Sequence, residues 1–261
     1  MNTALAILAH ALRMLIHEPS TTLRVILPAI LVVLGCSWAI TMLAGDLVTS
    51  MQVGGDLQYI PTPNAVFSFL VFGLIGLMGY ALMAILWHRH VLLNGADNRE
   101  NLRPDRRIFL SYVWRAIVLG LVQIIASIPA ALILGILAGA SLTGDPSGAT
   151  ATVLTFALGI ALVWIAMRLS LVLPAAALGH PMSLGQSWDE TKPAAAALWG
   201  VALLLSGLDT CMYLITSNLL PDTGLTGVLV QTFVYMLEGL VFVSMLTTLY
   251  GHLVEGRSLG Q

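Results

Sequence analysis

The 261-residue chain is 58% hydrophobic and only 9% charged, and its mean hydropathy is +0.91. Soluble domains carry roughly 25% charged residues, so this chain has too few to cover a water-facing surface. The composition excludes a soluble enzyme, a nucleic-acid-binding domain and a secreted disulfide scaffold, and the formal net charge of −2 favours no polyanionic partner. We expect an all-α integral membrane protein, with residues 1–261 forming a single polytopic membrane domain.

Residues 1–18 predict an amphipathic helix that lies in the membrane interface. On a helical wheel the apolar and polar residues gather on opposite faces. The apolar face holds Leu5, Leu8, Leu12, Leu15 and Ile16, and the polar face holds Thr3, His10, Arg13 and His17. The helix is either an anchor that packs against the bundle or a segment that senses the membrane or binds a partner. Pro19 is expected to end it, and Pro28 to lie in the first turn of the next helix.

Six apolar stretches follow, each close to the roughly 20 residues that a helix needs to cross about 30 Å of hydrocarbon. They cover residues 25–44, 65–87, 116–137, 153–173, 194–219 and 227–249, and they leave 250–261 as a tail. Helices are favoured over barrel strands because the apolar runs are continuous instead of alternating. We expect six transmembrane helices in three hairpins.

The basic residues fix the expected orientation of these spans. The connections at 45–64, 138–152 and 220–226 contain no Lys or Arg, and all eleven basic residues lie toward the opposite side. Basic residues concentrate in cytoplasmic loops, so both termini are predicted to be cytoplasmic.

Two further segments predict helices on the cytoplasmic surface. Residues 104–115 are basic and aromatic, and they lead into the third span. Before the fifth span, Ser183 to Gln186 and Ser187 to Glu190 each match a capping box. The chain can then be read as three units, each a surface helix followed by a membrane hairpin, although their sequences are too different to prove a repeat.

The run from Arg168 to Trp188 (RLSLVLPAAALGHPMSLGQSW) follows an even-numbered span. It resembles a stretch of bacterial six-span membrane proteins, namely the YciC-like proteins and the membrane domain attached to some glycerophosphodiester phosphodiesterases. Arg168, Pro174, Ser183 and Ser187 match positions that recur in that group. The resemblance implies a bacterial inner (cytoplasmic) membrane location and supplies no catalytic residues.

Motifs for catalysis or cofactor binding are absent from the sequence. It has no His-Glu-x-x-His, no phosphate-binding glycine loop and no Gly-x-Ser-x-Gly. Cys36 and Cys211 each lie in an apolar span, where a thiol behaves as a small hydrophobic group. His88 and His90 flank Arg89 where the second span leaves the bilayer, and we interpret them as interfacial side chains. We therefore predict no enzyme activity, no catalytic residue, no metal site and no cofactor.

Ionisable residues within the spans are the strongest functional signal, because each costs at least about 2.5 kcal/mol at mid-depth unless it is paired or solvated. Asp209 and Glu238 are equidistant from the turn between the last two spans, so they are predicted to face each other, with Arg168 reaching toward them. Polar stripes extend this candidate site: Ser206, Thr210, Tyr213 and Ser217 on the fifth span, and Gln231 and Tyr235 on the sixth.

Two function classes remain open. The first is transport, or the handling of a lipid or small amphiphile, through a polar site between spans four to six. The second is a non-catalytic scaffold or accessory subunit, in which the carboxylates form an internal clasp. The expected partners are membrane lipids together with a membrane-protein partner or a second copy of the chain, and not nucleic acid.

Overall fold

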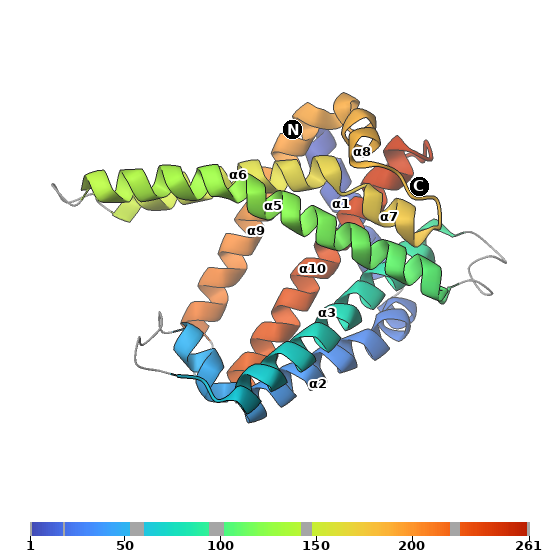
Figure 1. Cartoon of the computed structure of the whole chain (residues 1–261). Coiled ribbons are helices and arrows are strands. Elements are labelled where there is room, and N and C mark those ends of the chain that lie inside the picture. The colour runs from blue at the N-terminus through green and yellow to red at the C-terminus, as the bar shows by residue number, and fades with distance from the viewer. Residues whose placement is uncertain are drawn as a thin grey trace.

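The computed structural model describes residues 2–17, 19–52, 60–93, 102–141, 148–219 and 225–259, and these ranges contain helices and no strand. The helices, drawn in Figure 1, are α1 (Asn2–His17), α2 (Pro19–Gln52), α3 (Pro63–Leu92), α5 (Arg106–Ser141), α6 (Gly148–Leu169), α7 (Val172–Ala177), α8 (Leu184–Glu190), the 3-10 helix η1 (Lys192–Ala194), α9 (Ala195–Leu219) and α10 (Leu225–Leu253).

Within the described ranges, six segments are long and apolar enough to cross a membrane, which confirms the predicted class of multi-pass helical membrane protein. They run over Pro19–Ser50, Pro63–Leu92, Arg106–Ile133, Phe156–Ala177, Lys192–Thr216 and Leu225–Leu253. Their outer faces are apolar: Leu70, Leu77 and Ile125 are 62 to 65% exposed. A soluble monomer rarely exposes a continuous apolar surface of this kind, whereas lipid chains cover it without cost.

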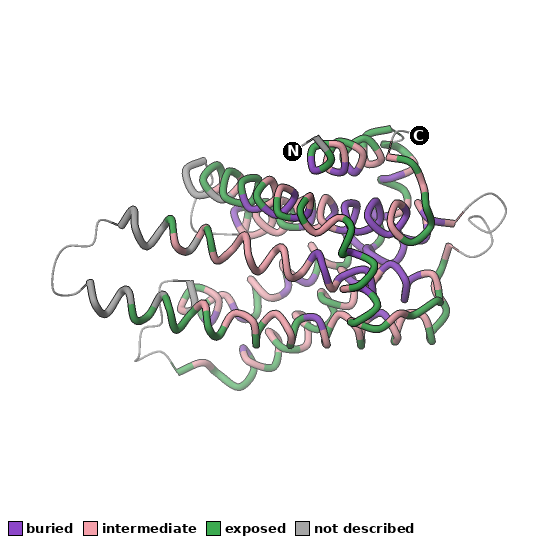
Figure 2. Tube along the Cα trace, turned by 90° about the horizontal axis from the view of Figure 1, so that it is seen from above, coloured by how far each residue is buried: buried purple, intermediate pink, exposed green. Residues whose placement is uncertain are grey.

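The packed core lies at the end of the molecule where both chain termini are found, which we call the terminal end (Figure 1). Figure 2 shows the buried residues gathered at this end, while the opposite halves of the long helices are mostly half-buried or exposed. Trp87, Met167, Leu198 and Leu246 are almost fully buried there. The bundle is therefore tight at its terminal end and loose at the other end.

The two helices of the first hairpin, α2 and α3, pack closely along their length. A Cβ added at Gly79 would lie 3.1 Å from Val32 and 3.2 Å from Val33, and one at Gly76 would lie 3.6 Å from Cys36. Small residues let helix backbones approach in lipid, where dispersion contacts drive association. These glycines thus serve packing within the chain.

Helix α1 packs on α9 and α10 through a face of small residues next to its leucine face. Ala4, Ile7 and Ala11 are at most 2% exposed, and a Cβ added at Gly200 of α9 would lie only 2.9 Å from the Cβ of Ala4. Leu5 and Ile16 of the leucine face are 47% and 70% exposed. Leu8 and Leu15 of the same face pack against the core clusters, so only part of the apolar stripe contacts the bundle.

Two expected helix boundaries are wrong. Pro28 lies inside α2 and not in its first turn, because α2 already begins at Pro19. Residues 104–115 do not form a separate surface helix, since α5 begins at Arg106 and continues into the third span. Asp105 caps it by accepting a 2.7 Å hydrogen bond from the backbone N–H of Ile108, and no Gly or Pro interrupts the first turns.

The fourth span ends with the short helix α7, and the connection from it to the fifth span contains α8. Ser183 and Gln186 form the predicted capping box at the start of α8. The second predicted box is wrong, because Ser187 is buried within α8 and its hydroxyl donates to the carbonyl of Arg168 at 2.9 Å. A serine that meets a carbonyl of another helix is used for packing and not for capping.

Candidate intramembrane site

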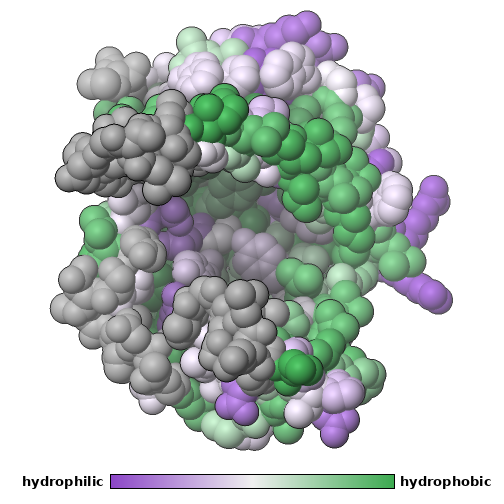
Figure 3. Space-filling model, turned by 60° about the vertical axis from the view of Figure 1, so that its left-hand side comes forward, coloured by the Kyte–Doolittle hydropathy of each residue, from purple (hydrophilic) through white to green (hydrophobic). Residues whose placement is uncertain are grey.

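A cavity of about 550 Å³ lies among α3, α6, α9 and α10. Its lining residues are Tyr80, Phe156, Gly159, Val163, Leu205, Ser206, Leu208, Asp209, Thr210, Tyr235, Glu238, Gly239 and Phe242. Figure 3 shows the molecule hollowed on this side, with hydrophilic atoms inside a rim that includes hydrophobic side chains. A volume of this size is in the range of small-molecule sites.

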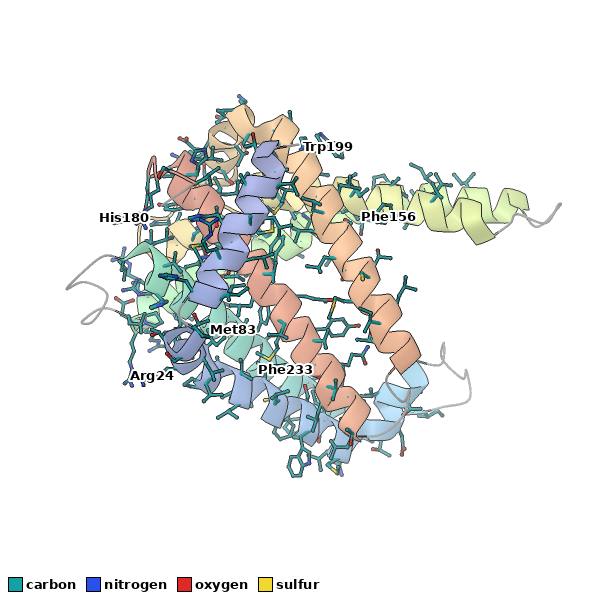
Figure 4. The ribbon with its side chains drawn as sticks, turned by 180° about the vertical axis from the view of Figure 1, so that it is seen from behind. Arg24, Met83, Phe156, His180, Trp199 and Phe233 are labelled. Carbon is teal, nitrogen blue, oxygen red and sulfur yellow. The ribbon has the colours of Figure 1, made fainter. Side chains whose placement is uncertain are left out.

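The cavity exists because α9 and α10 diverge. Helix α9 packs mainly on α6, whereas α10 packs on α1, α2 and α3, so the two helices make few contacts with each other. Figure 4 shows this divergence, with side chains from both helices directed into the interval, and the labelled Phe156 on α6 beside α9. The polar stripes of both helices therefore face an open space instead of a packed interface.

Asp209 and Glu238 both line this cavity and interact electrostatically. Asp209 lies 10 residues before the end of α9, and Glu238 lies 13 residues after the start of α10, roughly 15 to 20 Å from those ends. Among the described residues, no hydrogen bond or ion pair joins the two carboxylates or neutralises either of them. The site is thus acidic and lies within the apolar depth of the helices.

Tyrosine and serine hydroxyls complete the polar wall. The ring of Tyr80 lies over Gly239, the residue after Glu238, where an added Cβ would be 2.8 Å from ring carbons. Ser206 is 9% exposed, and its hydroxyl has no hydrogen-bond partner in the described part of the chain. A buried hydroxyl without a partner is costly, so Ser206 is a polar group that the surrounding packing leaves unsatisfied.

The remaining predicted site residues differ in position. Tyr235 lines the cavity, and its hydroxyl accepts a 3.1 Å hydrogen bond from the amide of Gln231, which itself is not on the cavity wall. The side chain of Tyr213 lies outside the described residues. Sequence reasoning missed Tyr80 and Phe156, because nothing in the sequence tells which face of an apolar helix meets another span. The one weak signal for Tyr80 was Gly239, since a residue without a side chain leaves room for a ring from another helix.

The expectation that Arg168 reaches toward the carboxylates is wrong. Arg168 is 3% exposed, and its guanidinium donates to the hydroxyl of Thr191 at 2.8 Å and to the carbonyl of Trp188 at 2.7 Å. It also stacks over the Trp188 ring at 4.0 Å and lies 5.3 Å from the Trp164 ring. The turn after α6 brings α8 and η1 back onto α6, so acceptor oxygens and aromatic rings close to the arginine satisfy it before any distant carboxylate can.

His88, interpreted from the sequence as an interfacial side chain, is instead buried among the helices, and so is its neighbour Arg89. His88 is fully buried, with its Nδ1 2.8 Å from the hydroxyl of Thr247, and Arg89 is 5% exposed and donates to the carbonyl of Ala177 at 2.6 Å. Helix α3 continues to Leu92, beyond the predicted end of the span, and α7 and α10 cover its last turns. Arg257 similarly donates to the carbonyls of Val91 and Leu92 at 3.2 and 2.7 Å. Arginines near the ends of the second, fourth and sixth spans thus clasp neighbouring backbone.

The chemistry available in the cavity is recognition of positive charge. Two carboxylates without a cationic partner attract a proton or a cation, and the rings of Tyr80, Tyr235, Phe156 and Phe242 provide apolar and cation–π surface. The described residues contain no group of three or more His, Cys, Asp or Glu side chains able to hold a metal ion.

No family model, curated protein or solved structure matches this chain. The fold and the site therefore define the class by themselves: a multi-pass helical membrane protein with an acidic, aromatic cavity among four of its helices.

Proposed function

We propose that the protein transports or handles a small amphiphilic cation in the membrane, through the cavity that contains Asp209 and Glu238. The observation that carries this proposal is that both carboxylates line one largely apolar cavity without a neutralising partner among the described residues. A ligand with an amine or other cationic group would balance the charge, while its apolar part would contact the aromatic wall.

The proposed location is a bacterial inner membrane with both termini in the cytoplasm. The distribution of basic residues supports the orientation, and the resemblance of the Arg168–Trp188 run supports the bacterial location. In this orientation the terminal end faces the cytoplasm, and the cavity lies in the looser half of the bundle. Opening of the cavity toward the outer leaflet would give an amphiphile access from lipid.

Binding of a matched pair of probes tests the proposal. Tetraphenylphosphonium and tetraphenylborate have nearly the same size and shape but opposite charge, so only charge recognition separates them. We expect the purified protein in neutral detergent at pH 8 to bind the phosphonium saturably and the borate at least about tenfold more weakly. Asp209→Asn and Glu238→Gln should each weaken phosphonium binding by a similar factor.

Matched controls are available on the same chain. Asp46 and Glu190 are exposed carboxylates outside the cavity, so Asp46→Asn and Glu190→Gln should bind the phosphonium as the wild type does. Equal binding of both probes, or unchanged binding by both cavity variants, would refute the proposal. Loss of folding in the cavity variants, measured by size-exclusion chromatography, would instead favour the alternative, a scaffold whose carboxylates maintain the helix arrangement.

A further inference from the structure

Two glycines, Gly159 of α6 and Gly239 of α10, line the cavity that contains Asp209 and Glu238, here called the acidic cavity. The two glycines differ in what lies over them. The ring of Tyr80 covers Gly239, so a Cβ added there would be 2.8 Å from ring carbons, whereas nothing lies within 4 Å of a Cβ added at Gly159. A side chain at position 159 would therefore enter space that no other part of the described chain fills.

The helix face that carries Gly159 is the face that meets the cavity. Phe156, Gly159 and Val163 all line the cavity, and their spacing of three and four residues keeps them on one side of α6. In Figure 4 the labelled Phe156 lies on the part of α6 beside α9. Because Gly159 has no side chain, the α6 wall has a notch between the side chains of Phe156 and Val163.

The notch lies at about the same level as the two carboxylates. Gly159 is 11 residues after the start of α6, Asp209 is 10 residues before the end of α9, and Glu238 is 13 residues after the start of α10. These three helix ends all point away from the terminal end (Figure 1), and each residue is roughly 15 to 20 Å along its helix from there. A cation held at the carboxylates would therefore direct a substituent toward Gly159.

The aromatic side chains of the cavity indicate the kind of cation that it fits. Tyr80 of α3, Phe156 of α6, and Tyr235 and Phe242 of α10 all line it. A primary ammonium needs hydrogen-bond acceptors for its three N–H donors, whereas a quaternary cation has no donor and is held by negative charge and by the faces of aromatic rings. Carboxylates among aromatic rings from three helices match a quaternary centre, and its apolar substituents need the additional space of the notch.

We propose that Gly159 determines which cations the acidic cavity accepts, and that its ligands are quaternary cations with bulky apolar substituents. The charge lies near Asp209 and Glu238, and the substituent nearest α6 occupies the notch at Gly159. This inference rests on the proposed function, and it adds the class of cation and the residue that sets its size limit.

Binding of two cations of different bulk to the purified full-length protein, in neutral detergent at pH 8, tests this proposal. Tetraphenylphosphonium has phenyl groups on every side of its charge, whereas phenethylammonium has its charge on a slim primary amine. We expect the wild type to bind the phosphonium at least about tenfold more tightly. Gly159→Leu should weaken phosphonium binding at least about tenfold and phenethylammonium binding less than about twofold, and Gly159→Ala should weaken phosphonium binding about threefold.

Gly207 of α9 provides a matched control. A Cβ added at Gly207 also has nothing within 4 Å, but this residue does not line the cavity. Gly207→Leu should therefore bind both cations as the wild type does. Leucine forms helices better than glycine, so both leucine variants are expected to fold, which size-exclusion chromatography checks. If Gly159→Leu does not fold, the smaller change Gly159→Ala decides the question.

The outcomes separate a failure of this inference from a failure of the proposed function. Unchanged phosphonium binding by the Gly159 variants, equal weakening of both cations by Gly159→Leu, or the same loss in Gly207→Leu would overturn the role of Gly159 while the proposed function stands. Equal affinity of the wild type for the two cations would overturn the ligand class. A wild type that binds no phosphonium would refute the proposed function, and this inference with it.

Discussion

Replacing Arg168 by lysine tests whether this arginine serves the clasp with α8 or the acidic cavity. The guanidinium donates from two different nitrogens, to Thr191 and to the carbonyl of Trp188, and stacks on the Trp188 ring. Lysine keeps the charge, but its ammonium cannot reproduce the planar fork or the stacking. A buried hydrogen bond to a charged group contributes about 1.5–3 kcal/mol, and a desolvated cation–π contact about 2 kcal/mol.

Arg168→Lys loses at least one of the two hydrogen bonds together with the stacking, so we expect it to lower the free energy of unfolding by about 2–4 kcal/mol. Arg168→Met should cost about 3–5 kcal/mol, because it removes both hydrogen bonds of the guanidinium together with the stacking. Reversible unfolding in mixed detergent micelles, followed by circular dichroism, measures both values.

A double-mutant cycle with Glu238→Gln separates the two roles of Arg168. If the clasp is the whole role, the effects of Arg168→Met and Glu238→Gln on the free energy of unfolding should add within about 0.5 kcal/mol. A coupling energy above about 1 kcal/mol would mean that Arg168 senses the cavity carboxylate. That result, or an Arg168→Lys protein as stable as the wild type, would refute the reasoning.

Three further predictions concern α1 and the orientation of the chain. Gly200→Ala should destabilise the protein by about 1–3 kcal/mol, because its Cβ would meet Ala4 at 2.9 Å. Gly207→Ala is the control and should not destabilise it, because nothing lies within 4 Å of a Cβ at that position. Equal thermal unfolding of the two variants would contradict the packing of α1. In a background without Cys36 and Cys211, a cysteine at Ile60 should react with an impermeant thiol reagent added outside intact cells and a cysteine at Arg107 should not, and the reverse pattern would invert the topology. Burial and the adjacent Arg13 lower the pKa of His10 below 6.5, so the unfolded chain takes up this proton first and stability is lost as the pH falls through 6.5. The melting temperature of the wild type should therefore fall more between pH 7.5 and 5.5 than that of His10→Gln, and equal falls would contradict this. The other charged or titratable groups near His10 are His90 on one side and His252 and Arg257 on the other.

The six apolar helices could be predicted from the sequence because lipid imposes a simple local rule: each span needs about 20 apolar residues and satisfies its own backbone hydrogen bonds. The capping box at Ser183 and Gln186 could be predicted for the same reason, since it depends on neighbours three residues apart. The grouping of Asp209 with Glu238 followed from their equal distance to one turn, and both residues line the same cavity.

Contacts between distant segments could not be predicted from such rules. The sequence alone established membrane helices, charge distribution and two mid-depth carboxylates, all of which depend on one segment at a time. The tertiary structure decided that Arg168 is bound by α8, that His88 is buried against Thr247, and that α9 and α10 diverge around a cavity. The reason is that the surface of an apolar helix is nearly uniform in hydropathy, so the face that meets a neighbour is selected by the shape and hydrogen bonding of side chains from distant parts of the chain.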